Sequence, residues 1–334
     1  MTVQHLYPLQ SLNTFGIKAY AEYFSSFSSK EELIELLGKM QKPLTILGGG
    51  SNILLTRDIS GTVLKNEISE IEIIHEDNDS LNVKVGGGVV WHDFVMWSIE
   101  HNLGGIENLS LIPGSVGAAP MQNIGAYGVE IKSVFEELEA VHIDNKTEKI
   151  FNNADCHFAY RYSIFKGELK GQYIICHVTF KLSKKPQFNT SYGALEEELK
   201  AMEASKSLQS VSQAVINIRQ RKLPNPKDIG NSGSFFKNPT IPKAKFEQLK
   251  AQFPNIVGYP NNKQSVKVAA GWLIDHAGWK GYRKGDAGVH KNQALVLVNY
   301  GTALGNEILN LSKDIQKSIK EIFGIELEAE VNIL

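Results

Sequence analysis

Apolar residues recur at helical spacing in five segments of the chain. The strongest pattern covers residues 303–323 and ends before Gly324, a residue that commonly terminates helices. Its apolar stripe consists of Ile308, Leu311, Ile315, Ile319 and Ile322. The same spacing predicts shorter helices over 29–37, 91–101, 208–223 and 267–276. Ser29 and Glu32 fit a capping box at the start of the first helix.

Short apolar runs between these helices predict strands. They cover 44–47, 53–55, 83–85, 135–143, 173–182 and 294–298. Asp144 and Asn145 lie between two apolar runs and predict a hairpin. Residues 325–333 alternate strictly, which predicts that the chain ends in a strand, 325–334, with Glu326, Glu328 and Glu330 on its polar face. Helices and strands mixed in this way, without an internal repeat, indicate an α+β fold with several modules.

Composition narrows the class of protein. The chain has 334 residues, which predicts about two domains, or three. Apolar residues make up 42% and the net charge is -1, so sizeable cores can form and no nucleic-acid-binding footprint is present. No run reaches the roughly 18 apolar residues of a membrane span, and residues 1–10 lack a secretory pattern. We therefore expect a cytoplasmic protein.

Two cysteines, Cys156 and Cys176, are each followed by a histidine. Both pairs lie in segments with strand character, where adjacent side chains point to opposite faces and cannot easily share one metal ion. Cytosolic thiols are kept reduced. We expect two buried thiols, with neither a disulfide nor a metal.

Three glycine-rich segments are candidates for binding phosphate through backbone N–H groups, because glycine lets the backbone approach a ligand closely. They are Gly48–Asn52, Gly86–Gly88 and the long stretch 112–128. The dinucleotide fingerprint fails in the first two, since Ile53 and Trp91 occupy the third glycine position. Taken singly, each of these two is as expected for a tight turn. The third has few charges, so it would hold phosphate by peptide N–H groups, or it is a buried connection packed by small residues.

Other clusters carry possible chemistry. Arg161 lies between tyrosines and could bind a carboxylate, or it could form a surface stacking pair. The basic run 219–222 closes a helix, where it matches the helix dipole or is simply solvated. Ser234 lies in a glycine-rich turn that could present its hydroxyl to a cleft, but the hydrolase motif Gly-x-Ser-x-Gly is absent.

These segments together resemble the UDP-N-acetylenolpyruvoylglucosamine reductase (MurB) family over essentially the whole chain. The matching segments are 13–16, 48–52, 112–114, 122–128, 160–161, 233–239, 270–274 and Glu330. Ser191-Tyr192-Gly193 resembles the tyrosine loop of the longer type in this family.

The resemblance implies a three-domain flavoprotein with an FAD-binding, vanillyl-alcohol-oxidase-like (PCMH-type) fold and an α+β substrate domain. Residues 1–65 and 66–210 would hold FAD, residues 211–324 would form the substrate domain, and the strand 325–334 would return to the first domain. The residues expected to contact FAD are Gly48, Gly49, Gly50, Ser51, Asn52, Pro113, Gly114, Ser115, Gly117, Ala118, Asn123, Gly125, Ala126 and Tyr127.

The implied reaction passes hydride from NADPH to FAD and then to the double bond of UDP-GlcNAc-enolpyruvate. By the same resemblance Arg161 and Glu330 act at the substrate carboxylate, and Ser234 protonates the enolate carbon. A glutamate helps there only if it is protonated or orients a donor. Tyr192, Lys222, Asn238 and Gln293 are the expected substrate contacts. Family habit implies a monomer. The composition and the cysteine pattern lead us to expect no metal and no nucleic-acid or membrane partner.

Three other functions stay open. An oxidase of the same fold would hand its electrons to oxygen. A binding module would sense a UDP-sugar or nucleotide without turnover, and a metal-dependent hydrolase would need ligands that the scattered Cys-His pairs do not readily supply.

Overall fold

The computed structural model describes residues 2–334, so Met1, the first residue of the predicted domain 1–65, lies outside it. Contacts divide the chain into two compact units. Unit 1 contains the residues up to Tyr7, Ala21–Gly49 and Ser60–Arg221, and unit 2 contains Pro8–Tyr20, Gly50–Ile59 and Lys222–Leu334. The functional division at residues 65/66 and 210/211 stays a prediction.

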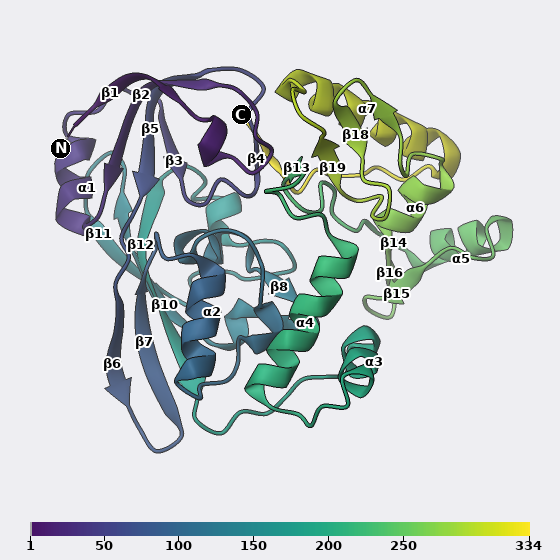
Figure 1. Cartoon of the computed structure of the whole chain (residues 1–334), viewed down its shortest axis with the longest axis horizontal. Coiled ribbons are helices and arrows are strands. Elements are labelled where there is room, and N and C mark those ends of the chain that lie inside the picture. Colours follow the sequence, from purple (N-terminus) through teal and green to yellow (C-terminus); the bar gives the residue numbers. More distant parts are fainter. Residues whose placement is uncertain (1) are drawn as a thin grey trace. The chain divides into compact units, whose positions relative to one another are not determined.

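Unit 1 is built on two sheets (Figure 1). The first has the strand order β1-β2-β5-β3, and β3 runs parallel to β5. Its strands are β1 (Gln4–Pro8), β2 (Tyr20–Phe27), β3 (Leu44–Leu47) and β5 (Ile59–Asn66). The second is antiparallel, with the order β11-β10-β12-β7-β6. Its strands are β6 (Ile71–Glu76), β7 (Ser80–Gly86), β10 (Phe135–His142), β11 (Glu148–Asn152) and β12 (Tyr173–Ser183).

Helices cover the apolar faces of unit 1. Helix α1 (Lys30–Leu37) buries Leu33 and Leu36 in a cluster with Cys176 of β12, and Ser29 caps it by accepting the N–H of Glu32. Helix α2 (Trp91–Glu100) packs into the largest core, which includes β7 and β12. Helices α3 (Gly193–Ala201) and α4 (Leu208–Lys222) share a third apolar cluster. Burial of these stripes stabilises each helix far more than intrinsic propensity does.

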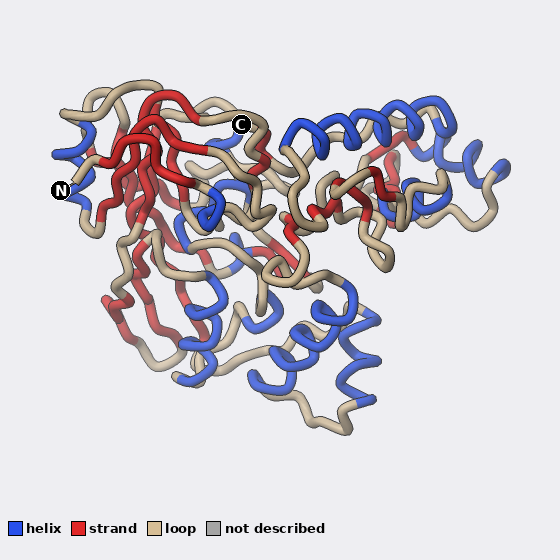
Figure 2. The backbone as a smooth tube through the Cα atoms, turned by 45° about the horizontal axis from the view of Figure 1, so that its top comes forward, coloured by secondary structure: helices blue, strands red, loops and turns tan. Residues whose placement is uncertain are grey.

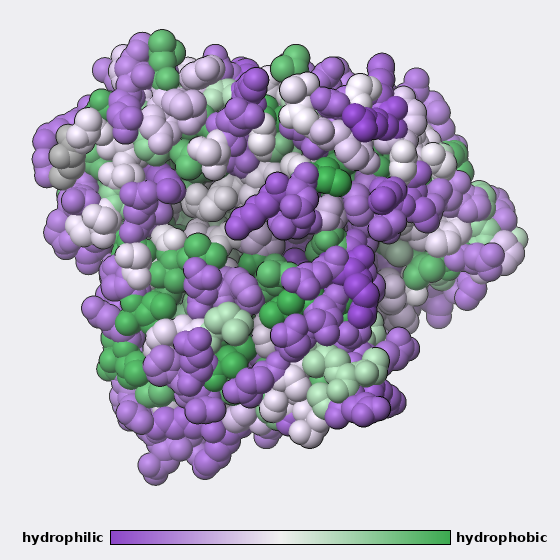
Figure 3. Space-filling view, viewed as in Figure 1, coloured by the Kyte–Doolittle hydropathy of each residue, from purple (hydrophilic) through white to green (hydrophobic). Residues whose placement is uncertain are grey.

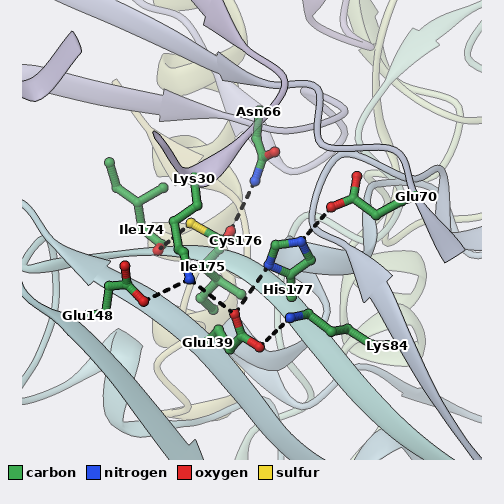
Figure 4. Close-up of polar contacts among 10 residues, drawn as sticks. All are labelled: Lys30, Asn66, Glu70, Lys84, Glu139, Glu148, Ile174, Ile175, Cys176 and His177. Atoms are coloured by element: carbon green, nitrogen blue, oxygen red, sulfur yellow. Dashed lines mark hydrogen bonds and ion pairs between the residues drawn. The ribbon is translucent and has the colours of Figure 1, made fainter. Parts of the chain in front are cut away.

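A network of charged side chains lies where α1 meets the second sheet (Figure 4). His177 of β12 is paired with Glu70 at 2.6 Å, and its second ring nitrogen lies 3.6 Å from Glu139 of β10. Glu139 also pairs with Lys84 of β7 and lies 3.7 Å from Lys30, the first residue of α1. The network therefore ties a helix to neighbouring strands through groups that are partly shielded from water.

Unit 2 contains three small sheets and three helices. The order β13-β19-β18-β17 and the order β14-β16-β15 are both antiparallel, and β20 runs parallel to β4. The strands are β4 (Ile53–Leu54), β13 (Gly230–Asn231), β14 (Thr240–Pro242), β15 (Gly258–Pro260), β16 (Ser265–Val268), β17 (Arg283–Lys284), β18 (Ala287–Val289), β19 (Leu297–Asn299) and β20 (Asn332–Ile333). The helices are α5 (Lys243–Gln252), α6 (Ala270–His276) and α7 (Gly305–Phe323). Figure 2 distinguishes these helices and strands by colour.

The elements match most of the predicted ones, and the α+β fold is confirmed. The predicted helix 267–276 is wrong in its first turn, because residues up to Val268 pair in β16 and α6 begins at Ala270. In the predicted strand 294–298 only Leu297 and Val298 belong to β19. The terminal strand is likewise shorter than expected, covering Asn332–Ile333. Before it, Ile325, Leu327 and Val331 are buried, and Glu326 and Glu328 are exposed, as the alternation predicted.

Two side chains also differ from their predicted environment. Ile322 is 44% exposed, and Phe323 completes the buried stripe of α7 instead, since the helical period of 3.6 drifts over its length. Cys156 lies in a turn rather than a strand, with His157 at a positive φ of 47°.

The predicted burial of the two thiols is confirmed, and desolvation raises the pKa of Cys156 and of Cys176 to about 12. Among residues 2–334, no group of three His, Cys, Asp or Glu side chains is arranged to hold a metal ion.

Apolar character is limited both in the helices and on the surface. No helix within residues 2–334 combines the length and apolar character that crossing a bilayer requires. The face in Figure 3 is mostly hydrophilic, with apolar side chains gathered at its lower left, over the region of β6, β7 and α2. Ile73 and Ile74 on the edge strand β6 are about half-exposed.

Candidate active site

Glycine segments far apart in the sequence converge in unit 1. A Cβ atom on Gly48 would lie 2.4 Å from the Ser115 hydroxyl, and one on Gly49 would lie 3.1 Å from the Gly114 Cα. A Cβ on Gly117 would lie 3.0 Å from the Gly87 Cα, and the Gly117 N–H donates to the Gly87 oxygen at 2.9 Å. The loops after β3 and after β7 therefore meet the segment around the 3-10 helix Val116–Ala118, at points where only glycine allows such close backbone approach.

Several backbone donors in this place have no acceptor within the protein. Within residues 2–334, the N–H groups of Gly49, Gly114 and Ser115 donate no hydrogen bond. Unpaired peptide N–H groups normally find water or a ligand. Three such donors on two touching loops, with no carboxylate beside them in the glycine contacts, suit the oxygens of a phosphate. The residues present thus fit a pyrophosphate held by the backbone.

Gly86–Gly88 has a different role from the other glycine segments. The Gly86, Gly87 and Gly88 N–H groups donate to the oxygens of Glu70, Cys176 and Ile68. Each of these glycines also lies too close to a neighbouring backbone to carry a Cβ. This segment is the tight turn that the alternative interpretation expected, and its Gly87 oxygen accepts the Gly117 N–H.

The predicted loop 123–128 is a short hairpin. Asn123 has a positive φ of 45° and holds the turn by donating to Glu130 and to the Ala159 oxygen. Gly125 and Ala126 form β8, which pairs with β9 (Val129–Glu130). Tyr127 and Gly128 make the turn with positive φ values. Burial raises the pKa of the Tyr127 phenol, so its O–H stays a donor.

Arg161 extends from a tight turn towards this hairpin. Ala159 and Tyr162 exchange two backbone hydrogen bonds, which forces Arg161 into a left-handed φ of 53°. Its guanidinium donates to the Gly125 oxygen at 3.1 Å, and its Tyr160 stacking distance of 5.8 Å is long. A non-glycine residue at such a φ costs about 1 kcal/mol or more, which occurs most often at functional sites.

Tyr192 stands beside the same hairpin. It is the residue before α3, and its ring packs edge-to-face on that of Tyr127 at 5.4 Å. Its side chain is 47% exposed. Unit 1 therefore brings together the predicted residues of the 48–49, 113–118 and 123–127 loops, Arg161 and Tyr192.

Ser234 and Glu330 come together in unit 2. Ser234 follows Gly233, which has a φ of 72°, and precedes Phe235, whose buried ring anchors the turn. The Glu330 N–H donates to the Phe235 oxygen at 2.8 Å. The Ser234 hydroxyl makes no hydrogen bond with any of the described residues 2–334. It is thus a hydroxyl that is held in place by its backbone and remains available to a ligand.

The three glutamates of the terminal segment, which the sequence pattern could not separate, differ in their surroundings. Glu326 pairs with Lys320, and Glu328 pairs with Lys237; both carboxylates are about three-quarters exposed. Glu330 is partly buried. Asn52 reaches this residue by donating from its side-chain amide to the main-chain oxygen of Glu330 at 3.3 Å. The predicted residues Asn52, Ser234 and Glu330 therefore adjoin one backbone segment.

The remaining predicted residues of unit 2 have separate places. Gly50 has a φ of 60° and touches the Leu12 oxygen so closely that a Cβ would lie 1.9 Å from it, while Ser51 follows it in the turn. Asn238 accepts the Ala270 N–H at the start of α6, and Gln293 lies beside Gly271 in the same turn. Lys222 is the exposed last residue of α4.

One charged residue was not singled out from the sequence. Arg219 was part of a basic helix end, but its Nε is buried and has no hydrogen-bond partner within residues 2–334. A signal was present: Arg219 follows the buried Val215 by four residues and therefore shares its face of α4.

Comparisons with known proteins agree with this geometry. Residues 23–150 match the family model of an FAD binding domain, and residues 225–334 match that of the UDP-N-acetylenolpyruvoylglucosamine reductase C-terminal domain. The UDP-N-acetylenolpyruvoylglucosamine reductase of Flavobacterium johnsoniae is 54% identical, covering 100% of both chains. That of Amoebophilus asiaticus is 52% identical with the same coverage. A reductase structure from Thermus caldophilus is 23% identical, with a TM-score of 0.71 and coverage of 100% and 99%, and shows the same fold.

A glycine-lined cradle of backbone donors inside an FAD binding domain defines a flavin-dependent oxidoreductase. The full-length relatives identify which one. The chain belongs to the UDP-N-acetylenolpyruvoylglucosamine reductase family.

Proposed function

We propose that this chain reduces UDP-GlcNAc-enolpyruvate to UDP-N-acetylmuramate, with FAD as cofactor and NADPH as reductant. The observation that carries the proposal is the convergence of the Gly48–Gly49 and Gly114–Ser115 loops around unpaired N–H groups in the FAD binding domain. Relatives that are more than half identical over the full chain bear the name of this reductase. The alternative as an oxidase has no comparable support.

The cofactor is held mainly by the backbone in this proposal. The N–H groups of Gly49, Gly114 and Ser115 hold its pyrophosphate, and the missing side chain of Gly117 and the small one of Ala118 let it approach. The hairpin 123–127 and the turn Gly50–Asn52 complete the contacts. When bound, FAD accepts hydride from NADPH and delivers hydride to the enolpyruvyl double bond.

The chain then has to stabilise the negative charge that develops beside the substrate carboxylate. Arg161 provides a fixed guanidinium, whose geometry suits a carboxylate. Glu330 either donates a hydrogen bond from a protonated carboxyl group or orients another donor, because an anionic oxygen would repel the enolate. Ser234 then donates its hydroxyl proton to the enolate carbon. Serine is a weak acid, so its placement by Gly233 and Phe235 must compensate.

Four other side chains contact the UDP-sugar in this proposal. Lys222 supplies a positive charge for the diphosphate, and Tyr192 covers the substrate. Asn238 and Gln293, which both lie at the first turn of α6, provide amide contacts. In this arrangement residues 1–65 and 66–210 hold FAD, and residues 211–324 form the substrate domain.

We place the reaction in peptidoglycan precursor synthesis, and hence in cell-wall biogenesis, cell shape and cell division. The expected location is the cytoplasm, where NADPH is available. The expected form is a monomer that acts without a metal, a membrane or a nucleic acid.

The visible spectrum of the purified protein tests this function. We expect flavin absorbance that NADPH bleaches and that UDP-GlcNAc-enolpyruvate restores under anaerobic conditions. Recovery with air that is as fast as recovery with substrate would favour the oxidase. Failure to take up FAD in excess would contradict the proposal, and would favour a binding module instead.

A further inference from the structure

Arg219 points from α4 into the loop region of unit 1. Ser212 on the same helix shares a buried 2.8 Å hydrogen bond with Ser110. Arg219 lies seven residues further on, which is two helical turns along the same face. Its side chain therefore faces the loops that follow Ser110, and its charge acts on Tyr127 in the hairpin of β8 and β9.

No acidic side chain balances this guanidinium. Within the described residues 2–334, Arg219 forms no ion pair or hydrogen bond, and its Nε is shielded from water. Arg221, two residues later, is bidentate to Glu198 and shows what a paired arginine looks like on this helix. Burial lowers the pKa of Arg219; the Tyr127 hydroxyl opposes this shift and the charge of Arg161 adds to it.

A cation that is largely shielded and lacks a counter-ion is unfavourable, and arginine does not escape by losing its proton; Arg219 as a residue is partly buried, with its Nε fully shielded. The neighbouring groups do not relieve it. Tyr127 is neutral because burial raises its pKa, and Arg161 is a second cation. Burial lowers the pKa of His92; the charge of Asp93 opposes this shift and that of Arg219 adds to it. The surroundings of Arg219 are therefore suited to an anion that arrives with a ligand.

The position of Arg161 indicates which anion this is. Arg161 donates to the Gly125 oxygen in the hairpin that carries Tyr127, and the charge of Arg219 acts on the same hairpin and on Arg161. One anion placed near both guanidinium groups would relieve their repulsion. We infer that Arg219 is a second guanidinium for the carboxylate of the enolpyruvyl group and determines specificity for substrates that carry it. This inference rests on the proposed function and adds to it a residue and a means of selection.

A consequence follows for substrate choice. UDP-N-acetylglucosamine shares the nucleotide and the sugar with the substrate but lacks the carboxylate. Binding it would leave Arg219 buried without a counter-ion, whereas a carboxylate ligand would satisfy it. A site that leaves a buried charge unpaired rejects the wrong ligand strongly.

The test compares two ligands on FAD-loaded, oxidised protein by calorimetry. UDP-N-acetylmuramate has the carboxylate and UDP-N-acetylglucosamine does not. In Arg219→Met we expect roughly 10- to 100-fold weaker binding of UDP-N-acetylmuramate and less than about twofold change for UDP-N-acetylglucosamine. Arg219→Lys should recover part of the loss, because it keeps the charge but not the planar fork. The exposed Arg57→Met is the matched control and should bind both ligands as the wild type does.

Other outcomes overturn the inference. If the variant bound both ligands equally more weakly, Arg219 would be a structural residue. A lower melting temperature of the variant would confirm that role. A lower flavin midpoint potential with unchanged UDP-N-acetylmuramate affinity would assign its charge to the reduced flavin. If wild-type protein binds neither ligand and reduces no UDP-GlcNAc-enolpyruvate, the proposed function itself is wrong, whereas normal wild-type behaviour with an unchanged Arg219→Met removes only the inference.

Discussion

Ser234 occupies a turn whose geometry does not depend on its hydroxyl. Gly233 supplies the positive φ. Phe235 buries its ring, and its backbone N–H donates to the Leu295 oxygen at 2.7 Å. Ser234→Ala should therefore leave the fold and the bleaching of flavin by NADPH intact. Product formation should fall by about 10²- to 10⁴-fold, as expected for the loss of a general acid. Stopped-flow absorbance measures the two half-reactions separately.

Ser232 provides a matched control for this variant. Its hydroxyl is buried and has no hydrogen-bond partner within residues 2–334, so Ser232→Ala removes no contact. We expect normal rates in both half-reactions and equal or slightly higher stability. Should Ser234→Ala slow both half-reactions equally, Ser234 would not be the proton donor.

Gly49 tests the backbone cradle at the same scale. An added Cβ would lie 3.1 Å from the Gly114 Cα, so the two loops would have to separate. Gly49→Ala should weaken FAD binding by about tenfold or more, measured by the quenching of FAD fluorescence on titration. Gly38→Ala is the control, because its Cβ would meet only the flexible end of Lys146 and a helix-end carbonyl. Unchanged FAD affinity in Gly49→Ala would argue against this cradle.

At the scale of elements, the charged network between α1 and the second sheet makes stability depend on pH. Burial alone would raise the pKa of Glu139, but the hydrogen bond and charge of Lys84, with His177 and Lys30, hold it below its ordinary value of 4.5. The carboxylate thus favours the folded state at neutral pH. This contribution is complete above the unfolded pKa and is lost as pH falls through the lower folded pKa.

Glu139→Gln should therefore lower the free energy of unfolding of unit 1 by about 0.5–1.5 kcal/mol at pH 7, since the pair is only partly shielded. The difference from wild type should shrink between about pH 5 and pH 3. Urea unfolding of the variant and of the wild type, followed by circular dichroism at pH 7 and between pH 5 and pH 3, measures this difference. The more exposed Glu148→Gln should have a smaller effect. A deficit that stays constant down to pH 3 would show that the loss is one of packing rather than of charge.

For the whole molecule, ligand binding should control stability. A ligand that binds only the folded state at 100 times its dissociation constant stabilises it by about 2.7 kcal/mol. FAD should therefore raise the melting temperature in proportion to the logarithm of its concentration. Riboflavin carries the same ring system without the pyrophosphate, so we expect a much smaller rise. Equal shifts for both compounds would show that the backbone donors at Gly49, Gly114 and Ser115 do not bind phosphate.

The periodic segments of the fold could be predicted from sequence because their pattern is local. The apolar stripe of α7 and the alternation of residues 325–331 follow from the helical and strand periods alone. The start of α6 could not be predicted, since Ser265–Val268 forms a strand only where β14 and β15 pair with it. The same holds for β20, which exists through its partner β4, almost the whole chain away.

The candidate site divides in the same way. The sequence by itself determined which residue types were available: glycine clusters, a serine beside glycine, an arginine between tyrosines, and through family resemblance the names of Ser234, Arg161 and Glu330. Only the tertiary structure decided that Gly49 meets Gly114, that Gly86–Gly88 is a supporting turn, and that Glu330 is less exposed than Glu326 and Glu328. It also decided that the Nε atom of Arg219 is buried without a hydrogen-bond partner among residues 2–334. The reason is physical: hydrogen-bond satisfaction and burial depend on contacts between distant segments, and local periodicity carries no record of them.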